Sequence, residues 1–268
     1  MSAEIVERVL RSPRYRDVDR ALLARLADEE VPRARNAADA VKRVKRRLHQ
    51  AVGAFSSGAA RPDVLAAAWS GDLTAPDFRA ACADAMRTYS STRERAEHLD
   101  AFYAGIWAVT GVPGRILDVG CGLNPLSLPW MGVPRDATYL ASDVDRRPLA
   151  AVSSFLTLVD QPHDVEVRDL VESPPVAEAD VALLLKVVTT LDRQDPVVAT
   201  NLLRTLRVRH AVVSFPTRSL GGHRRGMDRT YRDRLERLMD DAGRVSAVAE
   251  ASVPNELVFV LTLDAGDG

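Results

Sequence analysis

The spacing of apolar residues predicts helices throughout the first part of the chain. Up to about residue 110, apolar residues recur every three or four positions, and no alternating β pattern is present. Val41, Val44, Leu48 and Val52 form one such stripe, with basic residues around it. A segment rich in Gly, Ser and Pro, residues 56–62, then predicts a break between helices.

A further helix is predicted to begin at Ser91. Ser91 and Glu94 have the spacing of a capping box, in which two side chains bond backbone N–H groups at the helix start. The residues that follow at helical spacing and would form its buried face are Ala96, Leu99, Tyr103 and Ile106.

After residue 114 the pattern changes to short runs of Val, Ile and Leu that alternate with helical or loop segments. Such runs are typical of strands buried on both faces of a mostly parallel sheet. Six strands are predicted, in the sequences RILDVG, TYLASDVD, HDVEVRDL, ADVALLLKVV, HAVVSFPT and ELVFVLTL. We therefore predict an all-helical N-terminal domain at residues 1–110 and an α/β, doubly wound, Rossmann-like domain at residues 111–268.

Composition places the protein among cytoplasmic globular proteins. Apolar residues make up 46% of the chain, which suffices for a packed core. No apolar run approaches the roughly 20 residues that cross a bilayer, and the N-terminus lacks a basic region followed by an apolar stretch. Cys82 and Cys121 have no second Cys or His at ligand spacing, so we expect reduced thiols and no metal site.

Charge is distributed unevenly along the chain, although the formal net charge is only -1. Residues 31–50 hold seven basic residues and one acidic residue, and residues 217–237 hold seven basic and three acidic residues. Residues 136–195 instead hold twelve acidic and five basic residues. Two basic segments of this kind favour a nucleic-acid partner, whereas each alone is more typical of a solvated helix face.

A glycine turn after the first predicted strand is the candidate cofactor site. Ile116-Leu117-Asp118-Val119-Gly120-Cys121-Gly122 ends a strand with an acidic residue and two glycines, which let a backbone approach a ligand closely. Asp143 ends the next strand, where a carboxylate can accept hydrogen bonds from both ribose hydroxyls. Asp169-Leu170 ends the third strand, where the carboxylate and the apolar side chain could bracket the amino group and ring of an adenine. The three strand ends predict a nucleoside site.

The loop distinguishes between the two common cofactors that contain such a nucleoside. A dinucleotide fingerprint needs a third glycine and a helix N-terminus that is free for pyrophosphate, but Leu123-Asn124-Pro125-Leu126 follows Gly122. An acidic residue two positions before the first glycine suits S-adenosylmethionine (SAM), whose methionine end carries an ammonium and a sulfonium. The pattern resembles that of class I SAM-dependent methyltransferases, and SAM is the predicted cofactor.

A narrower resemblance rests on Asp118-Val-Gly-Cys-Gly-Leu-Asn-Pro-Leu followed by Pro129-Trp130-Met131-Gly132. These residues resemble the aminoglycoside-resistance 16S rRNA (guanine-1405 N7)-methyltransferases. Further matches include Ser12-Pro13-Arg14-Tyr15, Gly53-Ala54-Phe55, Ser91-Thr92-Arg93-Glu94-Arg95, Leu183-Leu184-Leu185-Lys186 and Ser214-Phe215-Pro216-Thr217-Arg218. One departure is Gly120, where relatives commonly have Ala; we expect no effect on cofactor binding.

The resemblance implies which residues bind the cofactor and the RNA. From the N-terminal side, the implied cofactor-binding residues are Phe55, Tyr89, Ser90, Ser91 and Arg95, the last pairing with the methionine carboxylate; from the α/β side, they are Gly120, Asp143, Asp169, Leu170, Leu185 and Gln194. Expected RNA contacts are Lys42, Arg43, Lys45, Arg46, Arg218, Arg224 and Arg225. From periodicity alone, however, Arg95 reads as a surface residue paired with Glu94 or Glu97, and Phe55 as ordinary core.

The implied reaction is methylation of guanine N7 in 16S rRNA of the 30S subunit, by a cytoplasmic monomer. Guanine N7 carries a lone pair and no proton at neutral pH, so no catalytic acid or base is assigned; positioning is what the enzyme must supply. Two other classes remain open. A methyltransferase for a small molecule such as an antibiotic would have little use for two basic surfaces, and a non-catalytic RNA-binding protein would lose the acidic strand ends.

Overall fold

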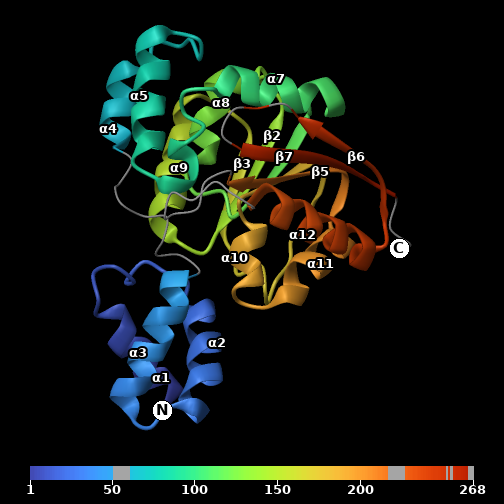
Figure 1. The fold of residues 1–268 in the computed structure, drawn as a ribbon. Coiled ribbons are helices and arrows are strands. Elements are labelled where there is room, and N and C mark those ends of the chain that lie inside the picture. Colours follow the sequence, from blue (N-terminus) through green and yellow to red (C-terminus); the bar gives the residue numbers. More distant parts are fainter. Residues whose placement is uncertain (51–60, 217–226, 252, 254–255, 265–268) are drawn as a thin grey trace.

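The architecture is a twisted sheet covered by helices on both faces, with a lobe of three helices beside it (Figure 1). The computed structural model describes residues 1–50, 61–216, 227–251, 253 and 256–264. Phe55, Arg218, Arg224 and Arg225 lie outside these residues, and so does the break predicted at residues 56–62, except for its last two positions. Among the described helices, none combines the length and apolar character needed to cross a membrane.

Seven strands form one sheet in the order β3-β2-β1-β4-β5-β7-β6. Strands β1 to β5 pair in parallel, β7 is antiparallel to β5, and β6 is antiparallel to β7. The strands are β1 (Arg115–Val119), β2 (Thr138–Asp143), β3 (His163–Val167), β4 (Glu178–Leu185), β5 (Arg207–Pro216), β6 (Val245–Ala251) and β7 (Glu256–Leu263). The order reverses direction beside β1, and ligands of doubly wound sheets bind at such a switch point. The predicted fold class is confirmed.

Alternate residues of the central strands face two separate cores, as the period of two requires. Ile116 of β1 packs on one face beneath α4 (Pro62–Ala68), α5 (Pro76–Arg87), α7 (Leu99–Thr110), α8 (Leu128–Met131) and α9 (Arg146–Leu158). Leu117 packs on the other face beneath α10 (Val188–Asp192), α11 (Pro196–Thr205) and α12 (Met227–Ala242). The helices of residues 62–110 therefore share a core with the sheet.

Strand β6 was not predicted. It lies at the edge of the sheet, and most of its side chains are half-buried or exposed, so its sequence lacks the continuous apolar run of the other strands. Edge strands with one solvated face give a much weaker sequence pattern than buried parallel strands.

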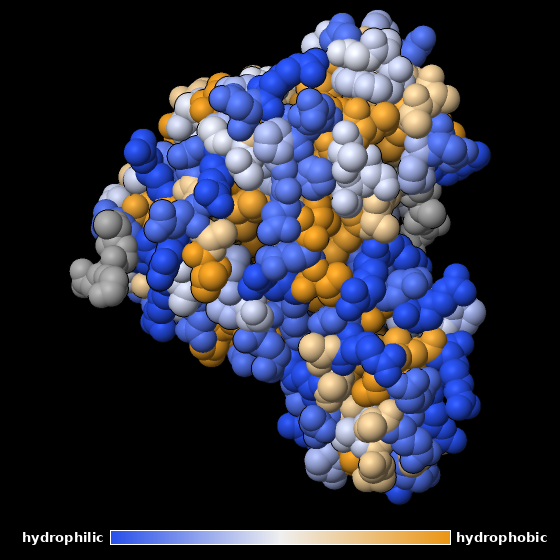
Figure 2. Space-filling view, turned by 180° about the vertical axis from the view of Figure 1, so that it is seen from behind, coloured by the Kyte–Doolittle hydropathy of each residue, from blue (hydrophilic) through white to orange (hydrophobic). Residues whose placement is uncertain are grey.

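The first three helices, together with a short 3-10 turn, form a lobe with its own core, which we call the N-terminal module (residues 2–48). It comprises α1 (Ser2–Leu10), α2 (Arg20–Glu30), η1 (Val31–Arg33) and α3 (Ala37–Leu48). Val44 and Leu48, from the predicted apolar stripe, are fully buried in it. The module projects from the body of the molecule in Figure 2 and meets it at Asp19, whose N–H donates to the carbonyl of Val144 at 2.9 Å.

The prediction of one helix that begins at Ser91 and continues through Ile106 is wrong for the first part of that range. The chain forms a short helix, α6 (Ser90–Arg93), then a turn, and α7 begins only at Leu99. The capping box does not form, because the Glu94 carboxylate instead accepts a hydrogen bond from Lys186 Nζ at 2.7 Å. A contact 92 residues away in sequence thus overrides the local capping pattern.

Candidate functional site

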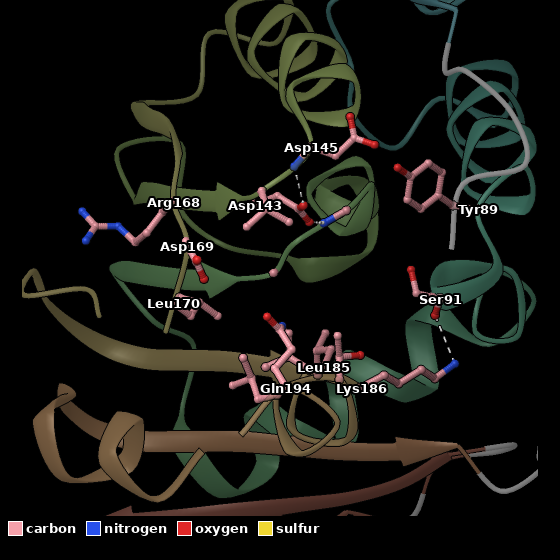
Figure 3. A pocket seen from close by; sticks show the side chains of 16 residues that line it. Tyr89, Ser91, Asp143, Asp145, Arg168, Asp169, Leu170, Leu185, Lys186 and Gln194 are labelled. Atoms are coloured by element: carbon pink, nitrogen blue, oxygen red, sulfur yellow. Dashed lines mark hydrogen bonds between the residues drawn. The ribbon is translucent and has the colours of Figure 1, made fainter. Parts of the chain in front are cut away.

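A pocket lies at the carboxyl ends of the parallel strands, next to the point where the strand order reverses. The space within it, counted out into the open solvent at its mouth, is about 710 Å³. Its wall combines the ends of β1, β2, β3 and β4 with the Tyr89 to Ser91 turn and the start of α10. Figure 3 shows Tyr89 and Ser91 across the pocket from Asp169 and Leu170.

Asp143, the last residue of β2, is held by backbone donors. Its Oδ2 accepts from the N–H of Gly122 at 2.9 Å, and its Oδ1 accepts from the N–H of Asp145 at 3.0 Å. Removal from bulk water raises the pKa of this carboxyl to about 6, although the two N–H donors favour the ionised form. Each oxygen can accept a second hydrogen bond, so the group can still serve ligand hydroxyls.

Asp118, the acidic residue before the glycine turn, does not line the pocket. It is 1% exposed, and its Oδ2 accepts from Asn124 Nδ2 at 2.9 Å and from the Tyr139 hydroxyl at 2.7 Å. Burial raises its pKa to about 6, against the effect of these two donors. The Asp118 carboxylate therefore holds the loop after β1 through Asn124 and is not presented to a ligand.

The glycine turn has a conformation that side chains disfavour. Gly120 and Gly122 have φ values of +64° and +53°. A Cβ built on Gly120 would lie 2.2 Å from Cγ2 of Val187, another residue of the pocket wall. An alanine at position 120 therefore fits this chain only if Val187 moves. That a glycine here does not impair cofactor binding stays a prediction.

Asp169 and Gln194 line the pocket from two separate loops and share one partner. Asp169 is 5% exposed, and its Oδ1 accepts from the N–H of Val171 at 3.1 Å. Arg25, from α2 of the N-terminal module, donates from Nε to Asp169 Oδ2 and from Nη2 to Gln194 Oε1, both at 2.9 Å. Nothing in the local sequence around Arg25 indicates this contact, which joins residues 144 positions apart.

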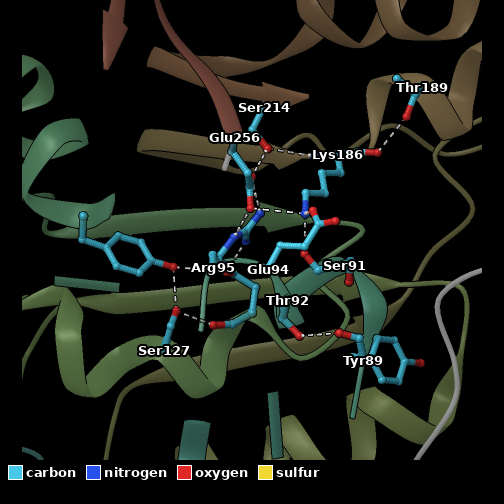
Figure 4. Close-up of polar contacts among 12 residues, drawn as sticks. Tyr89, Ser91, Thr92, Glu94, Arg95, Ser127, Lys186, Thr189, Ser214 and Glu256 are labelled. Atoms are coloured by element: carbon cyan, nitrogen blue, oxygen red, sulfur yellow. Dashed lines mark hydrogen bonds and ion pairs between the residues drawn. The ribbon is translucent and has the colours of Figure 1, made fainter. Parts of the chain in front are cut away.

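Lys186 connects the end of β4 to the Tyr89 to Ser91 turn. Its backbone has a φ of +61°, which a lysine rarely adopts, and its Nζ donates to the carbonyl of Ser91 at 3.1 Å and to Glu94. Nζ also lies 3.3 Å from Glu256 Oε1 (Figure 4). The side chain is 6% exposed, so Lys186 acts here as a fixed tie between two walls of the pocket.

Arg95 is not placed at the pocket. Its side chain is 2% exposed and forms a bidentate pair with Glu256, from Nε to Oε1 at 2.9 Å and from Nη2 to Oε2 at 2.8 Å. Its Nη1 donates to Asn124 Oδ1 at 2.8 Å. Neither Glu94 nor Glu97 is its partner, so the surface-pair interpretation is wrong; the partner lies 161 positions away.

Most of the predicted cofactor residues come together around this one pocket. Those on its wall are Tyr89, Ser91, Gly120, Asp143, Asp169, Leu170, Leu185 and Gln194. Ser90 begins α6 beside them, and Phe55 lies outside the described residues. Gly122 of the predicted glycine turn lines the pocket as well. Lining residues that sequence reasoning did not select are Val144, Asp145, Arg168, Lys186, Val187, Thr190 and Leu191. All are close chain neighbours of selected residues, so the rule that ligands bind at strand ends could have identified them.

The described part of the predicted RNA surface lies on α3. Lys42 and Arg46 are exposed, one helical turn apart, while Lys45 is half-buried. Arg43 donates to Asp39 Oδ2 at 3.1 Å and lies near Glu30, so part of its charge is compensated within the module. The second basic segment is also partly compensated, because Arg232 pairs with Glu250 and Arg234 with Asp192.

The pocket chemistry suits SAM better than a dinucleotide. Three carboxylates, those of Asp143, Asp145 and Asp169, belong to the pocket wall. Carboxylates accept hydrogen bonds from hydroxyl and amino groups and attract cations, but they repel a pyrophosphate. Among the described residues, no group of three or more His, Cys, Asp or Glu side chains could hold a metal ion.

Comparisons with known proteins agree with the family expected from the motifs. The family model described as "Ribosomal RNA methyltransferase (FmrO)" matches residues 11–260. A 16S rRNA (guanine(1405)-N(7))-methyltransferase of Frankia casuarinae is 39% identical over 95% of this chain and 91% of its own length. One of the same name from Micromonospora rosea is 35% identical over 96% of this chain and 95% of its own.

Solved structures give the same result. The 16S rRNA methyltransferase RmtF, in complex with S-adenosyl-L-homocysteine (SAH), superposes with a TM-score of 0.83 at 30% identity, covering 98% of both chains. The 16S rRNA methylase RmtB superposes with a TM-score of 0.79 at 26% identity, covering 98% of this chain and 99% of its own. This chain therefore belongs to the ribosomal RNA methyltransferase (FmrO) family, and it is a SAM-dependent rRNA methyltransferase.

Proposed function

We propose that this enzyme transfers a methyl group from SAM to N7 of guanine 1405 in 16S rRNA of the 30S subunit, and that this modification confers aminoglycoside resistance. What supports the target is the extent of the match, which includes the N-terminal module as well as the sheet and covers more than nine tenths of two relatives named for this reaction. A small-molecule methyltransferase would need the sheet and pocket but not a basic helical module.

We assign the pocket residues by their hydrogen-bonding capacity. Asp143 would accept from the ribose hydroxyls, while Asp169 and Leu170 would hold the adenine amino group and ring. Gly120 and Gly122 let the chain pass close to the cofactor. Tyr89, Ser91 and Leu185 would complete the wall. Arg95 would act on the methionine end through Asn124 and the neighbouring turn, because each of its three guanidinium nitrogens already has an acceptor and it does not line the pocket.

The protein's contribution to the reaction is alignment. SAM supplies a methyl group on a positively charged sulfur, and guanine N7 supplies the lone pair. The carbon–sulfur bond breaks as the carbon–nitrogen bond forms, so the positive charge passes to guanine and no proton moves. The pocket must therefore hold the sulfur, methyl and N7 in line and exclude water, without a general base.

The basic residues of α3 would bind the RNA backbone. Lys42 and Arg46 are the best placed, because they are exposed and one turn apart, and Arg43 and Lys45 would add to them. Phosphate contacts position an enzyme on RNA and make binding dependent on salt. We assign docking to the helical residues 1–110, catalysis to residues 111–268, and a cytoplasmic monomer as the working form.

The test incubates the protein with methyl-labelled SAM and one of three acceptors: purified 30S subunits, free 16S rRNA or an aminoglycoside. We expect label in the 30S subunits. Reduction with borohydride followed by aniline cleaves RNA at N7-methylguanosine, so primer extension should stop at the nucleotide immediately 3′ of guanine 1405. Asp143→Ala, which should not bind cofactor, is the control. Label in the drug, or 30S label without cleavage at this guanine, would overturn the assignment.

A further inference from the structure

The side chain of Arg25 extends from the N-terminal module to the wall of the cofactor pocket. It is 11% exposed, and each of its three guanidinium nitrogens has an acceptor. Nε and Nη2 donate to Asp169 and Gln194, and Nη1 donates to Glu29 Oε1 at 3.0 Å. A guanidinium with an acceptor on each nitrogen holds a single orientation and fixes its acceptors in turn.

The two pocket residues that Arg25 holds have complementary chemistry. Asp169 can only accept, and Oδ1 already accepts from the N–H of Val171, so Arg25 fixes the second oxygen. The Gln194 carbonyl faces the guanidinium, which leaves its amide nitrogen as the free donor. An acceptor beside a donor is the pattern that recognises the adenine edge, where an amino group lies next to a ring nitrogen.

The anchorage of Arg25 within the module is itself supported by ion pairs. Glu29 also accepts from Arg47 Nη2 of α3 at 3.1 Å. Arg47 Nη1 lies 3.3 Å from Glu30, a side chain that is only 5% exposed. Glu29 of α2, which is itself held by Arg47 of α3, thus fixes the position of Arg25. Arg25 in turn fixes Asp169 and Gln194 in the pocket wall.

We infer that Arg25 is a positioning residue of the cofactor site: it orients Asp169 and Gln194 so that they select the adenine base. This inference rests on the proposed assignment of Asp169 to the adenine end of SAM. It adds a side chain of the N-terminal module to a site whose lining residues all come from residues 89–194.

The test measures binding of SAH and of S-inosylhomocysteine by calorimetry. The second ligand has an oxo group in place of the adenine amino group and a proton on the neighbouring ring nitrogen, so both hydrogen-bonding positions of this edge are reversed. We expect Arg25→Ala to weaken SAH binding by about tenfold, because two acceptors lose their partner, while inosine-ligand binding changes much less. The preference for adenine should therefore shrink. Arg25→Lys keeps the charge but not the fork, and we expect an intermediate preference.

Two further variants make the result decisive. Arg20→Ala, also on α2, removes an exposed ion pair with Glu7 and should leave both affinities unchanged. Asp169→Asn tests the assignment on which the inference rests. If Asp169→Asn keeps the full adenine preference, the assignment itself is wrong. If Asp169→Asn loses the preference but Arg25→Ala and Arg25→Lys keep it, or lose affinity for both ligands equally, only the role of Arg25 is refuted.

Discussion

The buried pair of Arg95 and Glu256 allows a sharp prediction about stability. The two side chains are 2% and 0% exposed and form a bidentate contact (Figure 4). Arg95→Ala leaves the Glu256 carboxylate buried with Lys186 as its remaining cation and the Ser214 hydroxyl as a donor. Breaking a buried pair by removing one partner costs about 3–5 kcal/mol.

This cost should be visible as a large shift in the melting temperature. For a chain of this size, each kcal/mol corresponds to roughly 2–4 °C, so the Tm of Arg95→Ala should fall by roughly 6–20 °C. Arg232→Ala is the matched control, because its ion pair with Glu250 is 44% and 45% exposed; such pairs contribute at most about 1 kcal/mol. Circular dichroism melts of the three proteins at pH 7 measure the difference.

The pH dependence of the Tm difference provides an independent test of the buried pair. Burial alone would raise the pKa of Glu256, but the charges of Arg95 and Lys186 outweigh it and hold the pKa below its usual value. A lowered pKa means that the stabilisation is present above the unfolded pKa and is lost only as the pH falls through the folded one. Without Arg95, the carboxyl can take up a proton at higher pH. The Tm difference between wild type and Arg95→Ala should therefore narrow from pH 7 to pH 5.

A second substitution separates folding from cofactor contact. Arg95→Met with Glu256→Gln removes both charges and should recover about half of the lost Tm, since no uncompensated Glu256 carboxylate remains. SAH affinity should recover with it, because Arg95 does not line the pocket. The reasoning is refuted by a single-variant Tm within about 2 °C of the wild type, a threshold below the roughly 6 °C minimum expected, or by a Tm difference that widens in acid. Recovered Tm with lost SAH affinity would indicate direct contact with the cofactor.

The remaining predictions concern the pocket wall and the basic helix. Gly120→Ala should weaken SAH binding about tenfold, because the added Cβ would lie 2.2 Å from Cγ2 of Val187. Val187→Ala in the same chain should restore part of the affinity. An unchanged Kd for the single variant contradicts the packing argument. Because the pKa of Asp143 is raised to about 6 by burial, protonation should raise the Kd for SAH below pH 6 by up to about tenfold per pH unit, with a flat profile for Asp143→Asn. Charge reversal at Lys42 and Arg46 should weaken 30S binding and lower its log-log salt slope by about 0.7–0.9 per lost phosphate contact. SAH calorimetry of that variant should match the wild type, and equal 30S affinity would remove α3 from the RNA surface.

Sequence reasoning identified the strands and strand ends because their patterns are local. A buried parallel strand is apolar throughout, and a glycine turn at its end is visible in a few residues. This is why Gly120, Asp143 and Asp169 could be selected from the amino-acid sequence alone. Strand β6 was missed for the converse reason, since its exposed edge position imposes little apolar pattern.

Contacts between distant residues were beyond the reach of such patterns. The Ser91 to Glu94 spacing fits a capping box, yet the Glu94 carboxylate accepts a hydrogen bond from Lys186 Nζ instead. Arg95 reads as a surface arginine until its partner is known, because nothing near it in sequence shows that Glu256 lies beside it. In both cases the partner is a charged side chain at a strand end that is distant in sequence. Lys186 and the Arg95–Glu256 pair are buried, where the low dielectric strengthens the pairing.

The change of sequence pattern near residue 110 does not coincide with the change in packing. The residues up to Leu48 form the module's own core, whereas those from Leu65 onward share a core with the sheet. Tyr89 is one of the latter, so it keeps its place in the pocket if the module shifts. Arg25 would move with the module. A shift of the module on the ribosome would therefore leave Tyr89 in place. It would act on the adenine end of the pocket through Asp169 and Gln194, and also on Val144, whose carbonyl accepts from the N–H of Asp19.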